Sequence, residues 1–241
     1  MLIAGLQKTT LIDYPGKIAC VVFLAGCNFR CPWCYSSELV LPLKIAKQPR
    51  ISEKDFFDFL RERQGLLEGV VICGGEPTIN KELLQFIEKI KNLKYLVKLD
   101  TNGSNPGTLK DLVDTKLVDY VAMDIKTTKE KYPVVFSEAK NIKDIEKSVE
   151  FLETHSTSSG QAGGLDFEFR TTCVPGIHAK EDFLEIAKWI GGSNIKYYLQ
   201  NFRPEKTIDP EFEKIQPFKT EFLDEVVKEI SPFFKICILR S

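Results

Sequence analysis

The sequence predicts an α/β fold built on a sheet of parallel strands. Short apolar runs alternate along the chain with stretches in which apolar residues recur at helical spacing, as in repeated β-α-β units. Most of the apolar runs end directly in glycine or polar residues, and the carboxyl ends of parallel strands are where active sites form in such folds. We therefore expect a single domain over residues 1–241, arranged as a full barrel, a partial barrel or an open sheet.

The predicted strands are short. Residues 18–24 form a continuous apolar run, as expected of a strand that is buried on both faces. The later predicted strands are, in chain order, residues 69–73, 95–99, 118–123, 167–173, 195–200 and 234–239.

The predicted helices lie between these strands. They are residues 52–63, 81–92, 108–114, 142–153, 181–190 and 221–230. Asn141 is the expected N-cap of the helix at 142–153. Residues 155–164 are rich in Gly and Ser, and we expect a mobile loop there, either a lid over a partner or plain disorder.

The composition is that of a globular protein, and it lacks the basic excess that is typical of nucleic-acid-binding proteins. Lys and Arg number 33 against 34 Asp and Glu, whereas a dedicated nucleic-acid binder normally has a basic excess. No apolar run is long enough to span a membrane, and the first residues lack the layout of a signal peptide. The 7 cysteines are odd in number, so we expect a reduced, cytoplasmic protein whose clustered cysteines bind metal or take part in catalysis.

Three cysteines lie close together after the first predicted strand. Cys27, Cys31 and Cys34 have the spacing C-x3-C-x2-C. Thiolate sulfur prefers zinc, copper(I) or iron–sulfur clusters, but a closed zinc site takes four ligands, and the next cysteine, Cys73, is far downstream. Three thiolates suit a 4Fe–4S cluster with one iron left open for a substrate or cofactor. The alternatives are a disulfide with a spare thiol, or three buried cysteines.

A glycine pair, Gly74 and Gly75, follows the second predicted strand and precedes Glu76. Two glycines let a ligand approach the backbone closely, and the Glu76 carboxylate could receive an ammonium group. The alternative is an ordinary turn between a strand and a helix, where Gly and Pro are common.

Two acidic residues end neighbouring predicted strands. Asp100 and Asp124 are expected to lie near each other at the sheet edge, and two carboxylates side by side need a cation, a Lys or Arg, or a shared proton. Lys126 faces the same way as Asp124 if the strand continues. The more specific hypothesis is that the two carboxylates bind a cation. The alternative is that Asp100 only stabilises the turn that follows it.

The predicted strand at residues 167–173 has a charged face. Glu168 and Arg170 share that face by the period of two, and charge inside a parallel sheet needs partners. These residues either line an active-site cavity or pair with neighbouring strands. Asn201, at the end of the next strand, is a weaker candidate for contact with a nucleoside, and His178 is expected to have a plain structural role in its loop.

The cysteine motif, together with the Gly-Gly-Glu-Pro motif at residues 74–77, resembles the radical S-adenosylmethionine (SAM) superfamily. The Asp-Thr-Asn-Gly motif at 100–103, the Asp-Ile-Lys motif at 124–126 and Arg170 resemble glycyl-radical-enzyme activases. The opening of the chain, residues 5–17, resembles the activating protein of anaerobic ribonucleoside-triphosphate reductase. The resemblance covers essentially the whole chain.

The resemblance implies a partial (β/α)6 radical SAM barrel with parallel strands. It also implies that Cys27, Cys31 and Cys34 hold a 4Fe–4S cluster, whose remaining iron takes the amino and carboxylate groups of SAM. The residues that it assigns to SAM are Trp33 near the adenine, Tyr35, Gly74, Gly75 and Glu76 at the amino group, Lys126 and Arg170 at the carboxylate or ribose, and Asn201 where some activases have a His. A monovalent cation at Asp100 and Asp124, beside the SAM carboxylate, completes the implied site.

The implied activity is the activation of a partner enzyme. One electron from a small donor such as flavodoxin or ferredoxin cleaves SAM reductively, and the resulting 5′-deoxyadenosyl radical abstracts hydrogen from a backbone glycine of the partner, an anaerobic ribonucleotide reductase. No general acid or base is required, and neither nucleic acid nor membrane is an expected partner. Two alternatives stay open. One is a radical SAM enzyme that acts on a small molecule, as carboxy-deazaguanine synthases do, and the other is a structural zinc module with Cys73 as fourth ligand.

Overall fold

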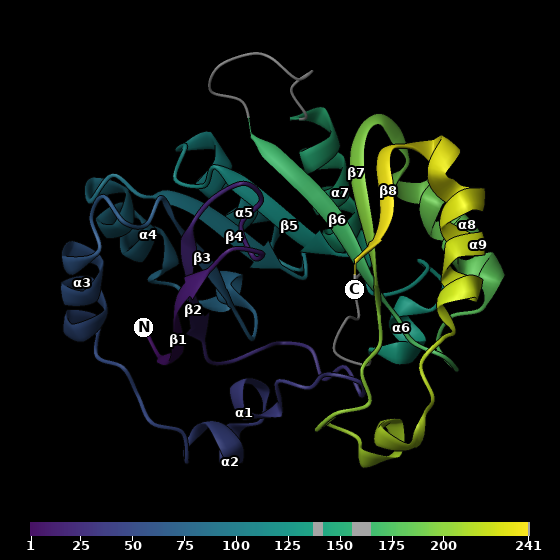
Figure 1. The fold of residues 1–241 in the computed structure, drawn as a ribbon, viewed down its shortest axis with the longest axis horizontal. Helices are drawn as coiled ribbons and strands as arrows, with labels where there is room; N and C mark the ends of the chain where they lie inside the picture. The colour runs from purple at the N-terminus through teal and green to yellow at the C-terminus, as the bar shows by residue number, and fades with distance from the viewer. Residues whose placement is uncertain (137–141, 156–164, 241) are drawn as a thin grey trace. The chain divides into compact units, whose positions relative to one another are not determined.

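The computed structural model describes residues 1–136, 142–155 and 165–240 (Figure 1). The chain forms two compact units. The first comprises Met1–Asn28, Ser36–Thr101 and Gly107–Val121, and the second comprises Phe29–Tyr35, Asn102–Pro106 and the chain from Ala122 onward. The predicted cap Asn141 and the predicted mobile loop, apart from His155, lie outside the described residues. The single domain expected over residues 1–241 stays a prediction.

The first unit contains strands that lie side by side in chain order. They are β1 (Ile3–Thr10), β2 (Ala19–Leu24), β3 (Gly69–Gly74) and β4 (Leu96–Thr101). β2, β3 and β4 run parallel, and their register pairs Cys20 with Val70 and Val70 with Val97. The same register places Leu24 opposite Gly74. The loop that follows β2 and the turn that follows β3 therefore begin next to each other.

β1 has no counterpart among the predicted strands, which begin at residue 18. It pairs antiparallel with β2, with register shifts near both of its ends. Only Ile3 and Thr10, the first and last residues of β1, are buried, while its middle is half-buried or exposed. A strand covered on so little of its length carries no continuous apolar run, so its sequence does not stand out.

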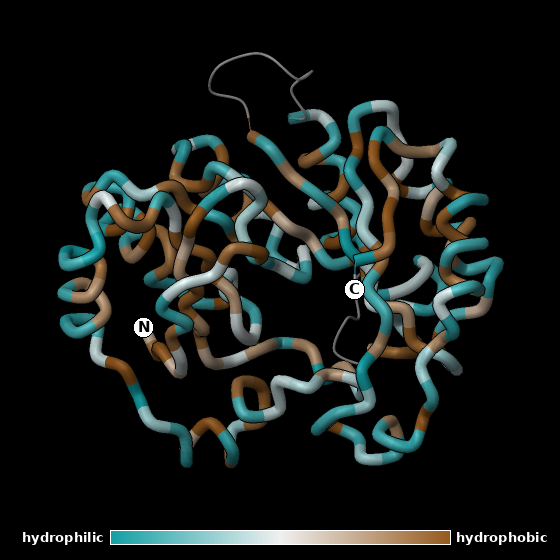
Figure 2. The backbone as a smooth tube through the Cα atoms, viewed as in Figure 1, coloured by the Kyte–Doolittle hydropathy of each residue, from teal (hydrophilic) through white to brown (hydrophobic). Residues whose placement is uncertain are grey.

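The first unit also contains helices. They are α1 (Ser37–Val40), α2 (Pro42–Ile45), α3 (Glu53–Glu62), α4 (Leu83–Asn92) and α5 (Pro106–Asp114). α4 contacts β4, and the first residue of α5, Pro106, belongs to the second unit. α3 starts at the N-cap Ser52, whose hydroxyl oxygen accepts a hydrogen bond from the Asp55 backbone N–H at 3.0 Å. Its apolar side faces α4, since the rings of Phe56 and Phe86 stack with centroids 5.4 Å apart. In Figure 2 α3 is hydrophilic on its outer side and apolar on the other.

The second unit contains three parallel strands and the helices beside them. The strands are β6 (Asp166–Cys173), β7 (Gly192–Asn201) and β8 (Phe234–Arg240), in that order. The helices are α6 (Tyr132–Val135), α7 (Ile142–Thr154), α8 (Lys180–Ile190) and α9 (Thr220–Ile230). α8 and α9 contact each other, and α9 also contacts β8 (Figure 1). The remaining strand, β5 (Tyr120–Asp124), begins in the first unit and ends in the second.

The predicted α/β class with parallel strands is confirmed. Each strand predicted from residue 18 onward corresponds to one of β2 to β8, and each predicted helix corresponds to one of the longer helices. The short helices α1, α2 and α6 were not predicted, because four residues are too few to show a helical period. Among the described residues, no helix has both the length and the apolar character needed to cross a membrane.

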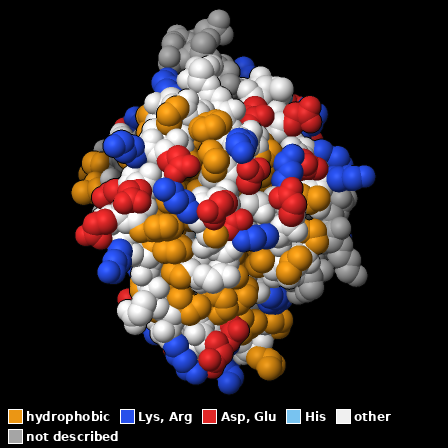
Figure 3. Space-filling model, turned by 90° about the vertical axis from the view of Figure 1, so that its right-hand side faces the viewer, with side chains coloured by type: hydrophobic (Ala, Val, Ile, Leu, Met, Phe, Trp, Pro, Cys, Tyr) orange, Lys and Arg blue, Asp and Glu red, His pale blue; other side chains and the backbone are white. Residues whose placement is uncertain are grey.

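Charged side chains of both signs are interspersed on the face of the molecule shown in Figure 3. This pattern agrees with the formal net charge of −1. The face that the figure shows therefore has no basic stripe of the kind that tracks a nucleic-acid backbone.

His178 joins two loops of the second unit. The Val174 backbone N–H donates to its Nδ1 at 3.0 Å, and its Nε2 lies 3.0 Å from the Lys126 carbonyl oxygen. A neutral ring protonated on Nε2 satisfies both contacts, whereas a protonated Nδ1 would face another donor. Burial lowers the pKa of His178 from 6.5 to about 4. The structural role expected for this residue fits these contacts.

We predict that His178 makes the protein lose stability in mild acid. Below pH 6.5 the unfolded chain binds a proton that the folded ring does not bind until the pH nears 4. The free energy of unfolding should therefore fall by on the order of 3 kcal/mol over this interval. Urea unfolding at a series of pH values measures the slope. His178→Gln should reduce the dependence of the free energy of unfolding on pH. The control variant His155→Gln, at an exposed site, should show the same pH dependence as the wild type. An unchanged pH dependence in His178→Gln would contradict the assignment.

Candidate active site

The loop with the three cysteines, residues 25–35, begins against the backbone of the turn at residues 74–76. The Gly75 N–H donates to the Leu24 carbonyl oxygen at 2.8 Å, and the Glu76 N–H donates to the Gly26 carbonyl oxygen at 2.7 Å. The Gly26 N–H in turn donates to the Leu39 carbonyl oxygen at 2.7 Å. Backbone hydrogen bonds thus hold the first residues of the loop in the first unit.

The glycine pair is required by this backbone contact. Gly74 has φ +121°, and a Cβ there would meet the Leu24 carbonyl oxygen at 2.3 Å. A Cβ on Gly75 would meet the Gly26 carbonyl oxygen at 1.9 Å. The sequence suggested that the two glycines admit a ligand. In the structure they admit the backbone of the cysteine loop.

The end of the cysteine loop is held in the second unit. The Ile208 N–H donates to the Cys34 carbonyl oxygen at 2.9 Å, and the Asp209 N–H donates to the Pro32 carbonyl oxygen at 3.0 Å. Cys34 also donates its N–H to the Cys31 carbonyl oxygen at 3.0 Å, which closes a turn. Cys31 and Cys34 therefore belong to the second unit, and Cys27 belongs to the first.

None of the seven cysteines, all of which lie within the described residues, forms a disulfide bond, so the disulfide alternative is not observed. Within the described ranges, no group of three or more His, Cys, Asp or Glu side chains is arranged to hold a metal ion. The loop nonetheless has the donors that an iron–sulfur cluster needs, because three soft thiols lie within eight residues. Burial raises the pKa of Cys20 to about 12 and that of Cys237 to about 11, and it raises the pKa of Cys173 further. These three stay protonated and are poor ligands.

Glu76 is buried, with 1% of its surface exposed. Its Oε1 accepts hydrogen bonds from the Thr78 N–H at 3.1 Å, the Thr78 hydroxyl at 2.5 Å and the Thr101 hydroxyl at 2.7 Å. The carboxylate thereby caps a short 3-10 helix, Pro77–Ile79, and joins it to β4. Its predicted contact with an amino group stays a prediction.

Asp100, near the end of β4, forms an ion pair with Lys98 two residues earlier. The side chain of Lys98 is only 2% exposed and that of Asp100 is 13% exposed. Lys98 was not among the predicted site residues, although a lysine inside an apolar strand, spaced by two from an aspartate, is a usable signal. Asp124 belongs to the other unit, so its expected proximity to Asp100 stays a prediction.

Asp124, at the end of β5, has two cationic partners in the second unit. Its Oδ2 lies 2.8 Å from Lys126 Nζ, and its Oδ1 accepts a hydrogen bond from Arg170 Nε at 2.9 Å. Burial alone would raise the pKa of the Asp124 carboxyl, but Arg170 and then Lys126 lower it well below its ordinary value. Lys126 and Arg170 both carry the donors that an anionic ligand group would need.

Lys126 also lies near one of the cysteines. Burial alone would lower the pKa of Lys126, but Asp124 and then Cys31 raise it above its ordinary value. The Lys126 backbone N–H donates to the buried Tyr132 hydroxyl oxygen at 2.8 Å. The second unit therefore brings together Cys31, Asp124, Lys126 and Arg170, all of which were predicted site residues.

Glu168, the other charged residue on β6, has a different partner. Its carboxylate accepts hydrogen bonds from both terminal nitrogens of Arg240, at 2.7 Å and 2.8 Å. The Arg240 guanidinium carbon lies 3.4 Å from the ring centroid of Tyr198. Two roles were considered for the charged face of β6. Arg170 contacts another predicted site residue, and Glu168 pairs with Arg240 of β8, the strand beyond the adjacent β7.

The remaining predicted contacts to SAM differ in their surroundings. Trp33 is buried and packs edge-on against Phe136, with ring centroids 5.7 Å apart. Tyr35 is 51% exposed. Asn201 donates from Nδ2 to the Phe218 carbonyl oxygen at 2.7 Å. Its buried Oδ1 has no hydrogen-bond partner among the described residues, so it is suited to accept one from a ligand.

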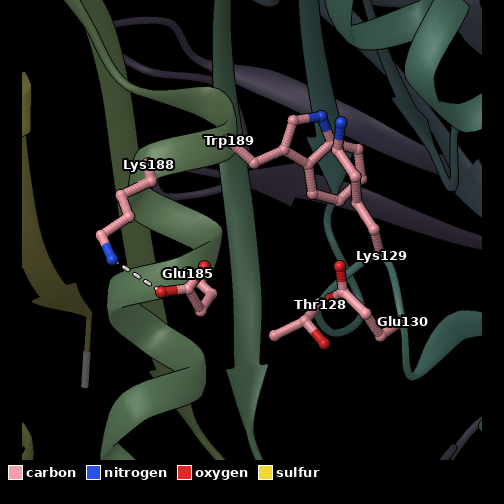
Figure 4. A pocket seen from close by; sticks show the side chains of 6 residues that line it. All are labelled: Thr128, Lys129, Glu130, Glu185, Lys188 and Trp189. Atoms are coloured by element: carbon pink, nitrogen blue, oxygen red, sulfur yellow. Dashed lines mark hydrogen bonds and ion pairs between the residues drawn. The ribbon is translucent and has the colours of Figure 1, made fainter.

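A pocket of about 230 Å3 lies elsewhere in the second unit, beside α8 (Figure 4). It is lined by Thr128, Lys129, Glu130, Glu185, Lys188 and Trp189. Lys129 lies 5.0 Å from the Trp189 ring centroid and pairs with Glu146 at 2.7 Å, and Lys188 pairs with Glu185 at 2.7 Å. None of the predicted site residues lines this pocket.

The chain is similar to known proteins along its whole length. A sequence model of the Radical SAM superfamily matches residues 21–190. The chain is 31% identical over 242 residues to a protein of Methanocaldococcus jannaschii whose name describes it as a candidate glycyl-radical enzyme activating enzyme. The match covers 100% of this chain and 96% of the relative.

Solved structures resemble the fold at low sequence identity. A radical SAM methyltransferase from Sphaerobacter thermophilus has a TM-score of 0.70 at 14% identity, covering 96% of this chain and 68% of that one. Streptococcus suis SuiB bound to its precursor peptide has a TM-score of 0.63 at 15% identity, and the chain spans 48% of its length. These similarities concern the fold alone.

We predict that Gly75→Ala disturbs the cysteine loop. The added Cβ would overlap the Gly26 carbonyl oxygen, so the loop backbone must shift, at a cost of about 1–3 kcal/mol in the free energy of unfolding. Gly107→Ala is the matched control, because a Cβ at this helical position meets nothing within 4 Å. Chemical denaturation measures both variants, and iron retained after anaerobic reconstitution should fall only in Gly75→Ala. Equal stability of the two variants would contradict the contact.

We predict that Asp124→Asn destabilises the protein by about 2 kcal/mol, because it leaves Lys126 and Arg170 without their shared carboxylate. The cost is below that of a fully buried pair, since the Asp124 side chain is 29% exposed. Asp58→Asn is the control, since Asp58 also lies between two cations, Lys54 and Arg61, but on the exposed side of α3. Thermal unfolding at neutral pH should show a clear loss for Asp124→Asn and little change for Asp58→Asn. The reverse order would contradict the prediction.

Proposed function

The chain belongs to the radical SAM superfamily, and we propose that it is an activase that generates a glycyl radical on a partner enzyme. The family predicted from the cysteine and Gly-Gly-Glu-Pro motifs is confirmed, as is the α/β fold with parallel strands. The chain is thus an enzyme, and membership of this superfamily implies a 4Fe–4S cluster and SAM. The match with the Methanocaldococcus jannaschii protein over 100% of this chain carries the proposal of an activase.

The residues present suit these cofactors. Cys27, Cys31 and Cys34, the three thiols of the loop, would hold the cluster. When bound, the cluster and SAM supply the one-electron chemistry that produces a hydrogen-abstracting radical. The role of the chain is to bind and orient them and to keep water away.

Several side chains are assigned to SAM itself. Lys126 and Arg170 meet an anionic group such as its carboxylate, because both side chains are cationic and lie together beside Asp124. Gly74, Gly75 and Glu76 meet the amino group, and Trp33 and Tyr35 lie towards the adenine. Asn201 offers its unpaired Oδ1 to a donor of the nucleoside.

The finer part of the proposal concerns the partners. The glycyl-radical enzyme is an anaerobic ribonucleoside-triphosphate reductase, supported by the motif at residues 5–17. The electron donor is a small protein such as flavodoxin or ferredoxin, and the enzyme works in the cytoplasm. The resemblance also implies a monovalent cation at Asp100 and Asp124, but the proposed activase function does not require one.

We predict a glycyl-radical EPR signal when the anaerobically reconstituted protein is mixed with SAM, dithionite and an anaerobic ribonucleotide reductase. Cys34→Ala should lower the signal by at least about 100-fold, because it removes a proposed cluster ligand. Cys237→Ala, which alters a cysteine outside the loop, should keep it.

The same assay separates the alternatives. Deoxyadenosine without a glycyl radical on any candidate partner would favour a radical SAM enzyme that acts on a small molecule. A colourless protein that holds one zinc ion and makes no deoxyadenosine would contradict the proposal and favour a zinc module that uses Cys73.

A further inference from the structure

Lys98 is a charged residue in the interior of the first unit. It lies on β4 between Val97 and Leu99, which are both fully buried, and its own side chain is 2% exposed. An ammonium group taken out of water destabilises the fold unless an anion compensates it. The contacts of Lys98 therefore identify the anion that compensates its charge.

The anion is Asp100. Residues spaced by two along a strand point to the same face, and Lys98 Nζ forms an ion pair with Asp100 Oδ1. The ring of Tyr120 has its centroid 6.0 Å from the ammonium, and Tyr14 packs against Tyr120 with centroids 6.0 Å apart. The ammonium thus lies between one carboxylate and an aromatic wall.

The pair changes the charge that Asp100 presents to a ligand. A lone carboxylate at a strand end would attract a monovalent cation from solution, which is the role expected for Asp100 and Asp124. In the first unit, however, Lys98 already supplies one positive charge for Asp100. In the second unit Asp124 has Lys126 and Arg170. Each acid therefore has a side-chain cation in its own unit.

We propose that Lys98 is the resident counter-ion of Asp100 and takes the place of a monovalent cation there. An ammonium carried on the same strand need not be recruited from solution, so its effective concentration exceeds that of any dissolved ion. SAM binding consequently does not depend on K+ or Na+. The inference rests on the proposed use of SAM at this site.

The test measures SAM binding to the anaerobically reconstituted protein by calorimetry, in potassium chloride and in tetramethylammonium chloride of equal ionic strength. The wild-type Kd should agree within about twofold between the two salts. Lys98→Met should bind SAM at least about tenfold more weakly in tetramethylammonium, and K+ should restore its affinity, because the variant removes the positive charge of Lys98 beside Asp100 and K+ can supply one. Lys91→Met, which removes the partner of Asp119 at 2.6 Å, is the matched control and should behave like the wild type.

A second readout does not depend on turnover. The thermal midpoint of the cluster-free protein should rise with K+ in Lys98→Met, while that of the wild type should not change. If Lys98→Met does not fold, Lys98→Gln takes its place. The comparison of the wild-type Kd in the two salts requires no variant.

A wild-type Kd that improves tenfold with K+ would overturn the inference, as would a Lys98 variant whose SAM affinity ignores K+. Failure to form a glycyl radical would overturn the proposed activase function and leave the cation result intact. Absence of SAM binding in both salts would overturn both proposals.

Discussion

The backbone contact between the start of the cysteine loop and the Gly74–Gly75 turn is the constraint on which the first unit's part of the site depends. Parallel pairing of β2 with β3 sets Leu24 opposite Gly74, and two further backbone hydrogen bonds then join the turn to the loop. No side chain fits between the two segments, since a Cβ at either glycine would overlap a carbonyl oxygen. Cys27 leaves the sheet from this point, so its position is set by the backbone.

Several buried and half-buried carboxylates form ion pairs with Lys or Arg side chains of the same unit. Three acids of the candidate site and the second unit have a cation within their own unit: Lys98 for Asp100, Lys126 and Arg170 for Asp124, and Arg240 for Glu168. Such pairs do little for stability, because desolvation offsets much of the attraction, but breaking one leaves an uncompensated charge. Their value is that they hold the charged groups in fixed positions before a ligand arrives.

Much of this arrangement was predictable from the amino-acid sequence. The parallel α/β class follows from the alternation of apolar runs with helical periods, and the cysteine spacing predicts the donors of a cluster. The strand period also places Lys126 with Asp124 correctly. β1 was not predictable, because a strand buried only at its two ends has no apolar run. The short helices were missed because four residues show no period.

The sequence by itself thus determined the family and the class of fold, and it predicted the residues proposed for the cofactors, since these depend on local spacing and on donor chemistry. Only the tertiary structure decided how the charges are paired. Arg170 turns to Asp124 and Glu168 to Arg240, a choice made by neighbours 46 and 72 residues away in the chain. The structure also explains why residues 74 and 75 are glycines. The steric contact that excludes a Cβ there involves distant backbone segments and exists only once the strands have paired.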